Sequence, residues 1–102
     1  MSRNRFAAKI DKNQPEIVKA LRALQGVTVA LNHDDILVGY QGVNYWYEIK
    51  DPEKLFKKDG SFAIGQIKPS QTKLASEWKG HYKIVWNLEM ILDDLGIKTA
   101  FL

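Results

Sequence analysis

Two runs of strand-forming residues, DILVGY and VNYWYEIK, are separated only by Gln41-Gly42, and this arrangement constrains the fold more than any other segment. A two-residue connection that contains glycine is typical of a β-hairpin, which we therefore predict over residues 35–50. Because side chains alternate between the two faces of a sheet, the turn also fixes which residues face each other. Three apolar residues in succession, Ile36 to Val38, further predict an interior strand that is covered on both faces.

Charged residues stand at the open end of this hairpin. Counting outward from a two-residue turn places Asp35 directly opposite Glu48, and Lys50 follows on the same face about 6.5 Å further along. A three-residue loop with a glycine bulge would instead place Asp34 opposite Glu48, and counting alone leaves both alternatives open. Directly opposed carboxylates repel each other, so their pairing at the end of a hairpin needs a compensating partner.

A hard divalent cation is such a partner. Mg²⁺ prefers oxygen ligands, and one or two carboxylates with water and a substrate phosphate commonly hold it. Such an ion activates water and polarises a phosphodiester, while a neighbouring lysine neutralises developing charge. The alternative is a solvated cross-strand salt bridge, since chance acid-x-base triplets are expected among 12 acidic and 15 basic residues. Glu77-Trp78-Lys79 is one such triplet.

The remaining chain alternates between helical and strand patterns, which predicts an α/β fold with a mixed central β-sheet flanked by helices. Residues 1–12 form a basic lead-in, and residues 13–102 form a single domain. The order is α-β-β-β-α-β-α, with a possible last strand. The predicted elements are a helix from Asn13 to Gly26, strands over 27–31, 35–40, 43–50, 82–86 and 97–102, and helices over 70–78 and 88–95.

Helix ends and one long connection complete this outline. Asn13 with Glu16 three residues later predicts a capping box, and Asn87 is expected to cap the last helix, which Gly96 ends. Residues 51–69 are predicted to be a lysine-rich loop, and loops of this length in small domains often carry function. His81 follows Gly80 and is predicted to belong to a turn.

Composition excludes several classes of protein. A chain of 102 residues without cysteine has no disulfide and no thiolate metal site, which fits a cytoplasmic protein. No apolar run approaches the roughly 20 residues of a membrane span, so no membrane partner is expected. The net charge of +3 permits a polyanionic partner without requiring one.

A family resemblance rests on three segments. HDDILVGYQGVNYWYEIKDP resembles the core of the PD-(D/E)xK nuclease superfamily, in which an aspartate opens one strand and E-x-K closes the next. NQPEIVKALRALQGVTV before it and KPSQTKLASEWKG after it are similar to stand-alone VRR-NUC nucleases of phages and bacteria, which in turn resemble archaeal Holliday junction resolvases. The similarity covers residues 11–96 in the same order and implies a restriction-endonuclease-like fold.

The resemblance also implies roles for individual residues. Asp35, Glu48 and the backbone carbonyl of Ile49 would bind the metal, Lys50 would be the catalytic lysine, and Glu16 of the first helix would reach the metal directly or through water. Gln71 would support the site, although packing beside Trp78 also explains it, just as capping explains Glu16. The chain departs from the family where Asp34 replaces the usual proline and Ile67-Lys68-Pro69 replaces Leu-Thr-Pro.

Taken together, these features predict a Mg²⁺- or Mn²⁺-dependent DNA endonuclease. The resemblance implies that it leaves a 5′-phosphate and acts on Holliday junctions or other branched DNA in a bacterial or phage-infected cell. The resemblance implies a symmetric homodimer, for which Ile97, Phe101 and Leu102 are candidate interface residues. Two alternatives are a catalytically inactive nucleic-acid-binding domain and a small protein-interaction domain. The predicted DNA contacts are Lys54, Lys57, Lys58, Lys68, Lys73, Lys79, Lys83, Arg3 and Arg5.

Overall fold

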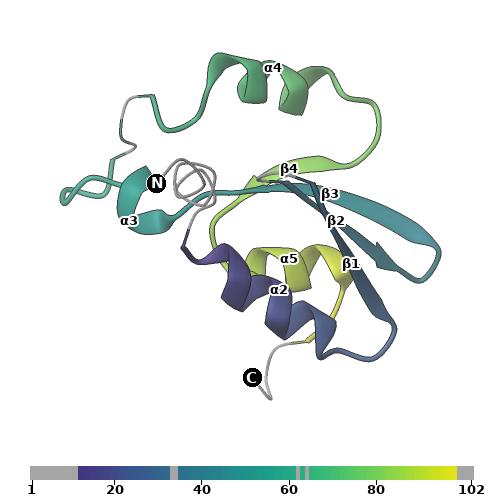
Figure 1. Cartoon of the computed structure of the whole chain (residues 1–102). Coiled ribbons are helices and arrows are strands. Elements are labelled where there is room, and N and C mark those ends of the chain that lie inside the picture. The colour runs from purple at the N-terminus through teal and green to yellow at the C-terminus, as the bar shows by residue number, and fades with distance from the viewer. Residues whose placement is uncertain (1–11, 33–34, 62, 64, 99–102) are drawn as a thin grey trace, which may run out of the picture.

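The computed structural model describes residues 12–32, 35–61, 63 and 65–98, which form a four-stranded mixed sheet with helices on both faces (Figure 1). The predicted α/β class is therefore confirmed. In chain order the elements are α2 (Gln14–Arg22), β1 (Val27–Asn32), β2 (Asp35–Tyr40), β3 (Val43–Ile49), α3 (Pro52–Leu55), α4 (Pro69–Glu77), β4 (Tyr82–Val85) and α5 (Leu88–Leu95).

The strands lie in the order β1-β2-β3-β4. The first two pairs are antiparallel, whereas β3 and β4 are parallel. Parallel neighbours need a long crossover connection, and residues 50–81 supply it, carrying α3 and α4. The last strand therefore extends the sheet beside the end of the hairpin, where Glu48 pairs with Ile84.

The hairpin turn has the geometry that the sequence predicts. Gln41 and Gly42 both have positive φ, of 51° and 78°, as expected for the two central residues of a type I′ turn. The turn pairs Tyr40 with Val43 and Asp35 with Glu48, so the predicted register is confirmed. The alternative register through Asp34 does not occur, and Asp34 itself lies outside the described residues.

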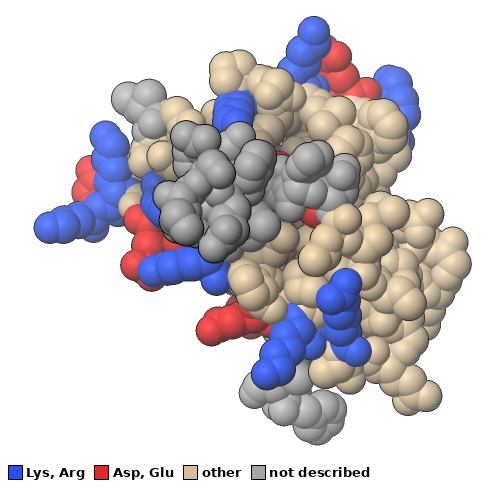
Figure 2. All heavy atoms as spheres, in the orientation of Figure 1, with Lys and Arg blue, Asp and Glu red and all other residues tan. Residues whose placement is uncertain are grey.

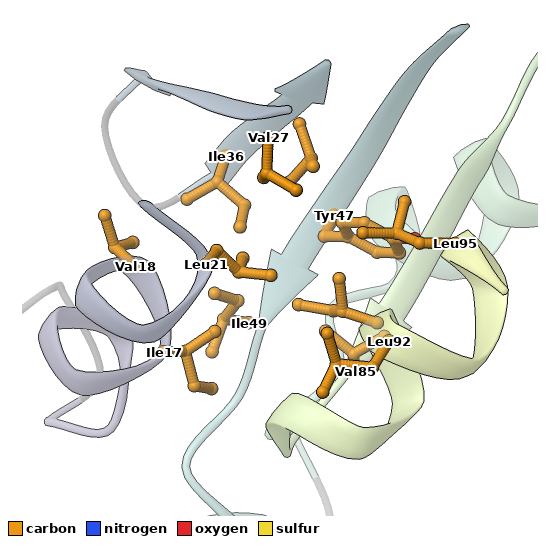
Figure 3. Packing of buried hydrophobic residues seen from close by; sticks show 12 residues of the cluster. Ile17, Val18, Leu21, Val27, Ile36, Tyr47, Ile49, Val85, Leu92 and Leu95 are labelled. Atoms are coloured by element: carbon orange, nitrogen blue, oxygen red, sulfur yellow. The ribbon is translucent and has the colours of Figure 1, made fainter. Parts of the chain in front are cut away.

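The core lies between one face of the sheet and helices α2 and α5 (Figures 1 and 3). We call this face, which carries Ile36, Val38, Tyr47 and Ile49, the core face. The opposite face, which carries Asp35, Leu37, Trp46 and Glu48, is called the outer face, and α4 lies over it (Figure 1). The buried core residues are Ile17, Val18, Leu21, Val27, Ile36, Val38, Tyr47, Ile49, Val85, Ile91, Leu92 and Leu95.

The outer face is only partly covered. β2 is an interior strand, as predicted, but the expectation that both of its faces are covered is wrong because Leu37 is 43% exposed. The reason is that α4 packs against β4 and, through Trp78, against Trp46 of β3. The outer face of β1 and β2 therefore stays open, and Thr28 and Ala30 are exposed there as well.

Two of the predicted helix ends need correction. The Asn13 side chain makes no capping hydrogen bond, so the predicted capping box with Glu16 is wrong, and α2 ends at Arg22 rather than next to Gly26. The Asn87 cap is confirmed by its acceptance of a hydrogen bond from the Met90 backbone N–H at 2.9 Å. Gly96 ends α5 in the left-handed conformation, also as predicted.

The predicted long loop is partly helical. Asp51 accepts a hydrogen bond from the Glu53 backbone N–H at 2.9 Å and so caps the short helix α3. Leu55 in this helix is buried, which anchors the connection to the rest of the domain. Residues 51–69, which were predicted to be a loop, therefore begin with the short helix α3 close to Lys50.

The C-terminal prediction is also corrected. Ile97 and Lys98 are not in a strand, and Ile97 packs against the core instead of offering an exposed interface. Arg3, Arg5, Phe101 and Leu102 lie outside the described residues. Within the described ranges, every helix is too short or too polar to cross a lipid bilayer.

Candidate active site

The paired ends of β2 and β3 bring three charged side chains together on the outer face. Asp35 and Glu48 are direct cross-strand partners, and Lys50 follows two residues after Glu48. The Lys50 ammonium nitrogen lies 3.8 Å from Glu48 Oε2. Glu48 is only 3% exposed, and the Lys50 side chain is 12% exposed. A carboxylate pair and an amine therefore meet in a largely desolvated position, where electrostatic interactions are stronger than in water.

The two carboxylate oxygens of Asp35 have different surroundings. Oδ2 accepts a hydrogen bond from the Trp46 indole N–H at 3.2 Å. Oδ1 is buried and has no hydrogen-bond partner among the residues that the structure describes. A buried carboxylate oxygen without a donor is costly, and a bound cation is one kind of ligand that would satisfy it. The donor set of Asp35 and Glu48 thus fits Mg²⁺ or Mn²⁺, which bind carboxylate oxygens.

The backbone of Lys50 is fixed from two directions. Its N–H donates to the carbonyl of Val85 at 2.8 Å. Its carbonyl accepts from the side-chain amide of Asn13 at 3.0 Å, and the same amide donates to the Trp86 carbonyl at 3.3 Å. Asn13 therefore ties the start of α2 to the ends of β3 and β4. This positioning role takes the place of the predicted cap.

Glu16 is not grouped with the other two acids. It is exposed on α2, which covers the core face, whereas Asp35 and Glu48 project from the outer face. It lines a hollow of about 280 Å³ together with Asn13 and Trp86, at the end of the sheet where Lys50 lies. Within the described parts of the chain, no three histidine or acidic side chains gather around one point. The described cluster is thus a pair of carboxylates with a lysine.

The supporting residue Gln71 has a structural role in α4. Its side-chain oxygen accepts a hydrogen bond from the Lys68 backbone N–H at 3.0 Å and so caps the helix. The predicted buried face that Gln71 shares with Trp78 is not formed. The structure describes every residue of α4, and none of them is buried.

An aromatic group connects α4 to the carboxylates. The Trp46 ring meets Trp78 edge to face, with ring centroids 5.4 Å apart, and Tyr82 at 4.7 Å. Gly80 is required for this packing, because a Cβ there would lie 2.9 Å from the indole nitrogen of Trp78. The sequence indicated that Trp46 shares a face with Glu48, but it gave no reason to expect that Trp46 binds Asp35.

A second polar network lies on the core face. Asp94 of α5 accepts hydrogen bonds from the Tyr47 hydroxyl at 3.0 Å and the Lys83 ammonium at 2.9 Å, and His81 Nε2 lies 3.1 Å away. The His81 ring also packs edge-on against Tyr45 and Tyr47. The residue predicted to belong to a turn therefore has a packing role as well. Lys83 was predicted to contact DNA, but its ammonium group binds Asp94, which distinguishes it from the other predicted DNA contacts.

Burial and hydrogen bonding shift two pKa values in this network. Burial raises the pKa of the Tyr47 hydroxyl far above its usual range, and the bond to Asp94 adds to the effect. Burial also acts to raise the pKa of the Asp94 carboxyl, but the hydrogen bonds from Lys83 and Tyr47 outweigh it and hold this pKa below its usual value. The network anchors Tyr47, the residue before Glu48, to α5.

The other predicted DNA contacts within the described ranges are on the surface. Figure 2 shows lysine and arginine side chains at the left edge, where α3 and the turn after it lie, and at the top, over α4. Acidic side chains lie among them, so the basic surface is not continuous in this view. The exposed lysines of this set are Lys54, Lys57, Lys58, Lys68, Lys73 and Lys79.

Comparison of the chain with protein-family models, with curated proteins and with solved structures gives no match.

Proposed function

We propose that this chain is a divalent-metal-dependent DNA endonuclease of the VRR-NUC type in the PD-(D/E)xK superfamily. The observation that carries the proposal is the direct pairing of Asp35 with Glu48, with Lys50 on the same face. The unsatisfied Oδ1 of Asp35 supports it further, because a carboxylate kept without a donor suits a metal ligand better than a solvated salt bridge. The four-stranded mixed sheet with its helices is compatible with the α/β class that the resemblance implies.

The proposed reaction is hydrolysis of a phosphodiester bond. Asp35 and Glu48 would hold the cation, which when bound would polarise the phosphodiester and promote ionisation of water. Lys50 orients the attacking water and neutralises negative charge that develops on the phosphate oxygens. The water oxygen bonds to phosphorus as the bond to the 3′ oxygen breaks, and a proton passes to that oxygen. The products are a 5′-phosphate and a 3′-hydroxyl.

The substrate of this proposal is branched DNA, such as a Holliday junction. A chain of 102 residues covers only part of a junction, so we propose a homodimer with one active site for each cleaved strand. Once Asp35 and Glu48 are assigned to the metal site, ten acidic side chains remain against 15 basic ones, which favours a polyanionic partner. The proposed location is the cytoplasm of a bacterial or phage-infected cell.

A cleavage assay tests the proposal. Supercoiled plasmid and a synthetic four-way junction are incubated with Mg²⁺, Mn²⁺ or EDTA, and the products are resolved by electrophoresis. The wild-type chain is expected to cleave at least one substrate with either metal and neither with EDTA. Lys50→Ala is expected to lower the rate by a factor of about 10² to 10⁴, as loss of a positioned acid–base or electrostatic group does.

A matched variant separates catalysis from a general effect of charge. Lys19→Ala removes an exposed lysine of α2 and is expected to cleave at the wild-type rate. If the wild-type chain binds the junction but cleaves nothing with any metal, the chain is instead a nucleic-acid-binding domain without turnover. If it neither binds DNA nor is stabilised by Mg²⁺ in thermal unfolding, the interaction-domain alternative replaces both.

A further inference from the structure

Trp78 is an unusual surface residue because its large apolar ring is 50% exposed while its orientation is fixed. It follows α4, and its backbone N–H donates to the Leu74 carbonyl at 2.9 Å. The Trp78 ring lies at an interplanar angle of 89° to the Trp46 ring, with centroids 5.4 Å apart, and the absent Cβ of Gly80 leaves room for the indole nitrogen. An exposed aromatic ring held in place in this way loses little side-chain entropy when a ligand stacks on it.

Its position relative to the candidate active site is defined by one intermediate residue. Trp46 contacts Trp78 through its ring and donates a hydrogen bond to Asp35, and it precedes Glu48 by two residues on the outer face. Trp78 is therefore joined to the carboxylate pair by direct contacts on one face of the sheet. A group that stacks on Trp78 would lie beside the groups that act on the phosphate.

The surroundings of Trp78 match a nucleotide in polarity and charge. The ring borders an open hollow of about 370 Å³ whose other lining residues include Leu74, Lys73 and Glu77. Lys79 is adjacent in sequence and exposed, and Lys68 stands at the other end of α4. Lys73 and Lys79 against one glutamate next to an apolar ring provide a stacking surface with cations for the flanking phosphates, and Lys68 adds a cation further along α4; stacking and cations together are the combination that binds single-stranded nucleic acid.

We propose that Trp78 is a stacking platform for an unpaired nucleobase, so that the preferred ligand has a single-stranded segment beside the scissile phosphate. The part of this inference that concerns the scissile phosphate rests on the proposed function, whereas base stacking does not. In a duplex, both faces of a base are covered by its neighbours, so only unpaired or splayed bases can stack on the ring. The platform therefore favours branched and gapped DNA over continuous duplex.

Binding measurements in EDTA test the platform without any cleavage. A labelled oligothymidine of about 16 nucleotides and a duplex of the same length are titrated with protein, and affinity is read by fluorescence anisotropy. Trp78→Ala is expected to weaken single-strand binding about tenfold, the typical effect of losing one stacked base, and duplex binding less than about twofold. Trp78→Phe, which keeps an aromatic face, is expected to retain most of the affinity for the single strand.

Two further variants control for packing and for general hydrophobicity. Gly80→Ala keeps the ring but displaces it, and is expected to reduce single-strand affinity while the fold, followed by circular dichroism, is retained. Leu31→Ala removes another exposed apolar side chain, 53% exposed, and is expected to change neither affinity. Equal losses for single strand and duplex in Trp78→Ala, or no loss at all, would overturn the proposal.

The two proposals fail in different ways. A chain that binds single strands through Trp78 but cleaves no DNA with any metal would retain the platform and lose the nuclease. A chain that cleaves junctions, and in which Trp78→Ala leaves single-strand affinity unchanged, would retain the nuclease and lose the platform. A third result would assign the ring to a protein partner instead. In that case Trp78→Ala leaves single-strand affinity unchanged, whereas the wild-type chain binds apolar peptides and the variant does not.

Discussion

At Asp35 a difference between two oxygen atoms of one side chain distinguishes a candidate metal ligand from an ordinary surface acid. The Trp46 indole fixes Oδ2 and so sets the direction of the carboxylate, while Oδ1 is left without a donor in the described structure. Glu48 lies directly across from it. Two opposed acids cost stability in the absence of a cation, so the site is expected to trade stability for binding.

Asp35→Asn tests this trade directly. In EDTA the variant is expected to unfold at a temperature about 1–8 °C higher than wild type, because removing one of two opposed charges is worth about 0.2–1 kcal/mol. Mg²⁺ is expected to raise the unfolding temperature of wild type but not of the variant, since only the former binds the ion. Thermal unfolding with and without the metal checks both. Asp93→Asn on α5, an exposed acid, is the control and should behave as wild type.

Tyr47 gives a prediction at alkaline pH. Its pKa is raised by burial and by the bond to Asp94, so the phenolate forms only in the unfolded chain, where the pKa is about 10. The stabilising contribution of this residue is complete below pH 10 and is lost above it, at about 1.4 kcal/mol per pH unit. Tyr47→Phe lacks this loss, although it is expected to cost about 1 kcal/mol at neutral pH through the missing hydrogen bond.

Urea unfolding from pH 7 to pH 11 measures the effect. The difference in free energy of unfolding between wild type and Tyr47→Phe is expected to shrink above pH 10. Parallel curves over the whole range would show that the hydroxyl ionises equally well in the folded protein.

Among the elements, the hairpin of β2 and β3 determines the geometry of the site. A two-residue turn with both residues at positive φ holds the register, and the register alone decides that Asp35 faces Glu48. A slip of one residue would move every side chain to the other face. The charged end of the hairpin therefore depends on a turn about five residues away along each strand.

Gly42→Ala is the matching test. A Cβ at this position meets no neighbouring atom, so the only cost is the backbone conformation, with φ of 78°. The variant is expected to lose about 1 kcal/mol, seen as a decrease of roughly 4–8 °C in unfolding temperature. Gln41→Asn is the counterpart and is expected to stabilise the hairpin, since Asn-Gly is the preferred type I′ pair. An unchanged stability in both variants would contradict the assigned turn.

These elements also show what can be predicted from sequence. The hairpin and the last helix were predictable because their signals are local: a two-residue turn, a period of two, and a cap followed by a glycine stop. Counting from the turn narrowed the register to two alternatives, with Asp35 or Asp34 opposite Glu48. The role of Asn13 could not be predicted from local signals, since its partners Lys50 and Trp86 are 37 and 73 residues away. The same holds for His81, which meets Asp94 only after α5 has packed. The prediction that Leu37 is covered was wrong, because the composition of a strand does not reveal how far α4 extends over the sheet.

For the whole molecule, the distribution of charge matters more than the net charge of +3. The exposed lysines within and after α3 and those around α4 come from the single connection between β3 and β4. That connection begins at Lys50, and its later part, α4, lies over the outer face, which also carries the candidate site (Figure 1). A long polyanion that reaches Glu48 would meet these lysines on the way.

Salt dependence checks this arrangement. The double variant Lys57→Ala, Lys58→Ala is expected to reduce the slope of log affinity for duplex DNA against log salt by about 1.8, since each phosphate contact contributes about 0.9. The double variant Lys19→Ala, Lys98→Ala removes the same charge from other exposed positions and should leave the slope nearly unchanged. Equal slopes in the two variants would mean that only overall charge matters.

The parallel pairing of β3 with β4 has a consequence for how the molecule assembles. The hairpin is local and can form early, but the amide of Lys50 finds its acceptor at Val85 only after the intervening chain has looped back. Asn13 likewise needs Trp86 before it bridges both strands. A chain still being synthesised on the ribosome would thus carry Asp35, Glu48 and Lys50 before Val85 and Trp86 were available to fix them, so the cleavage that we propose would begin only in the completed domain.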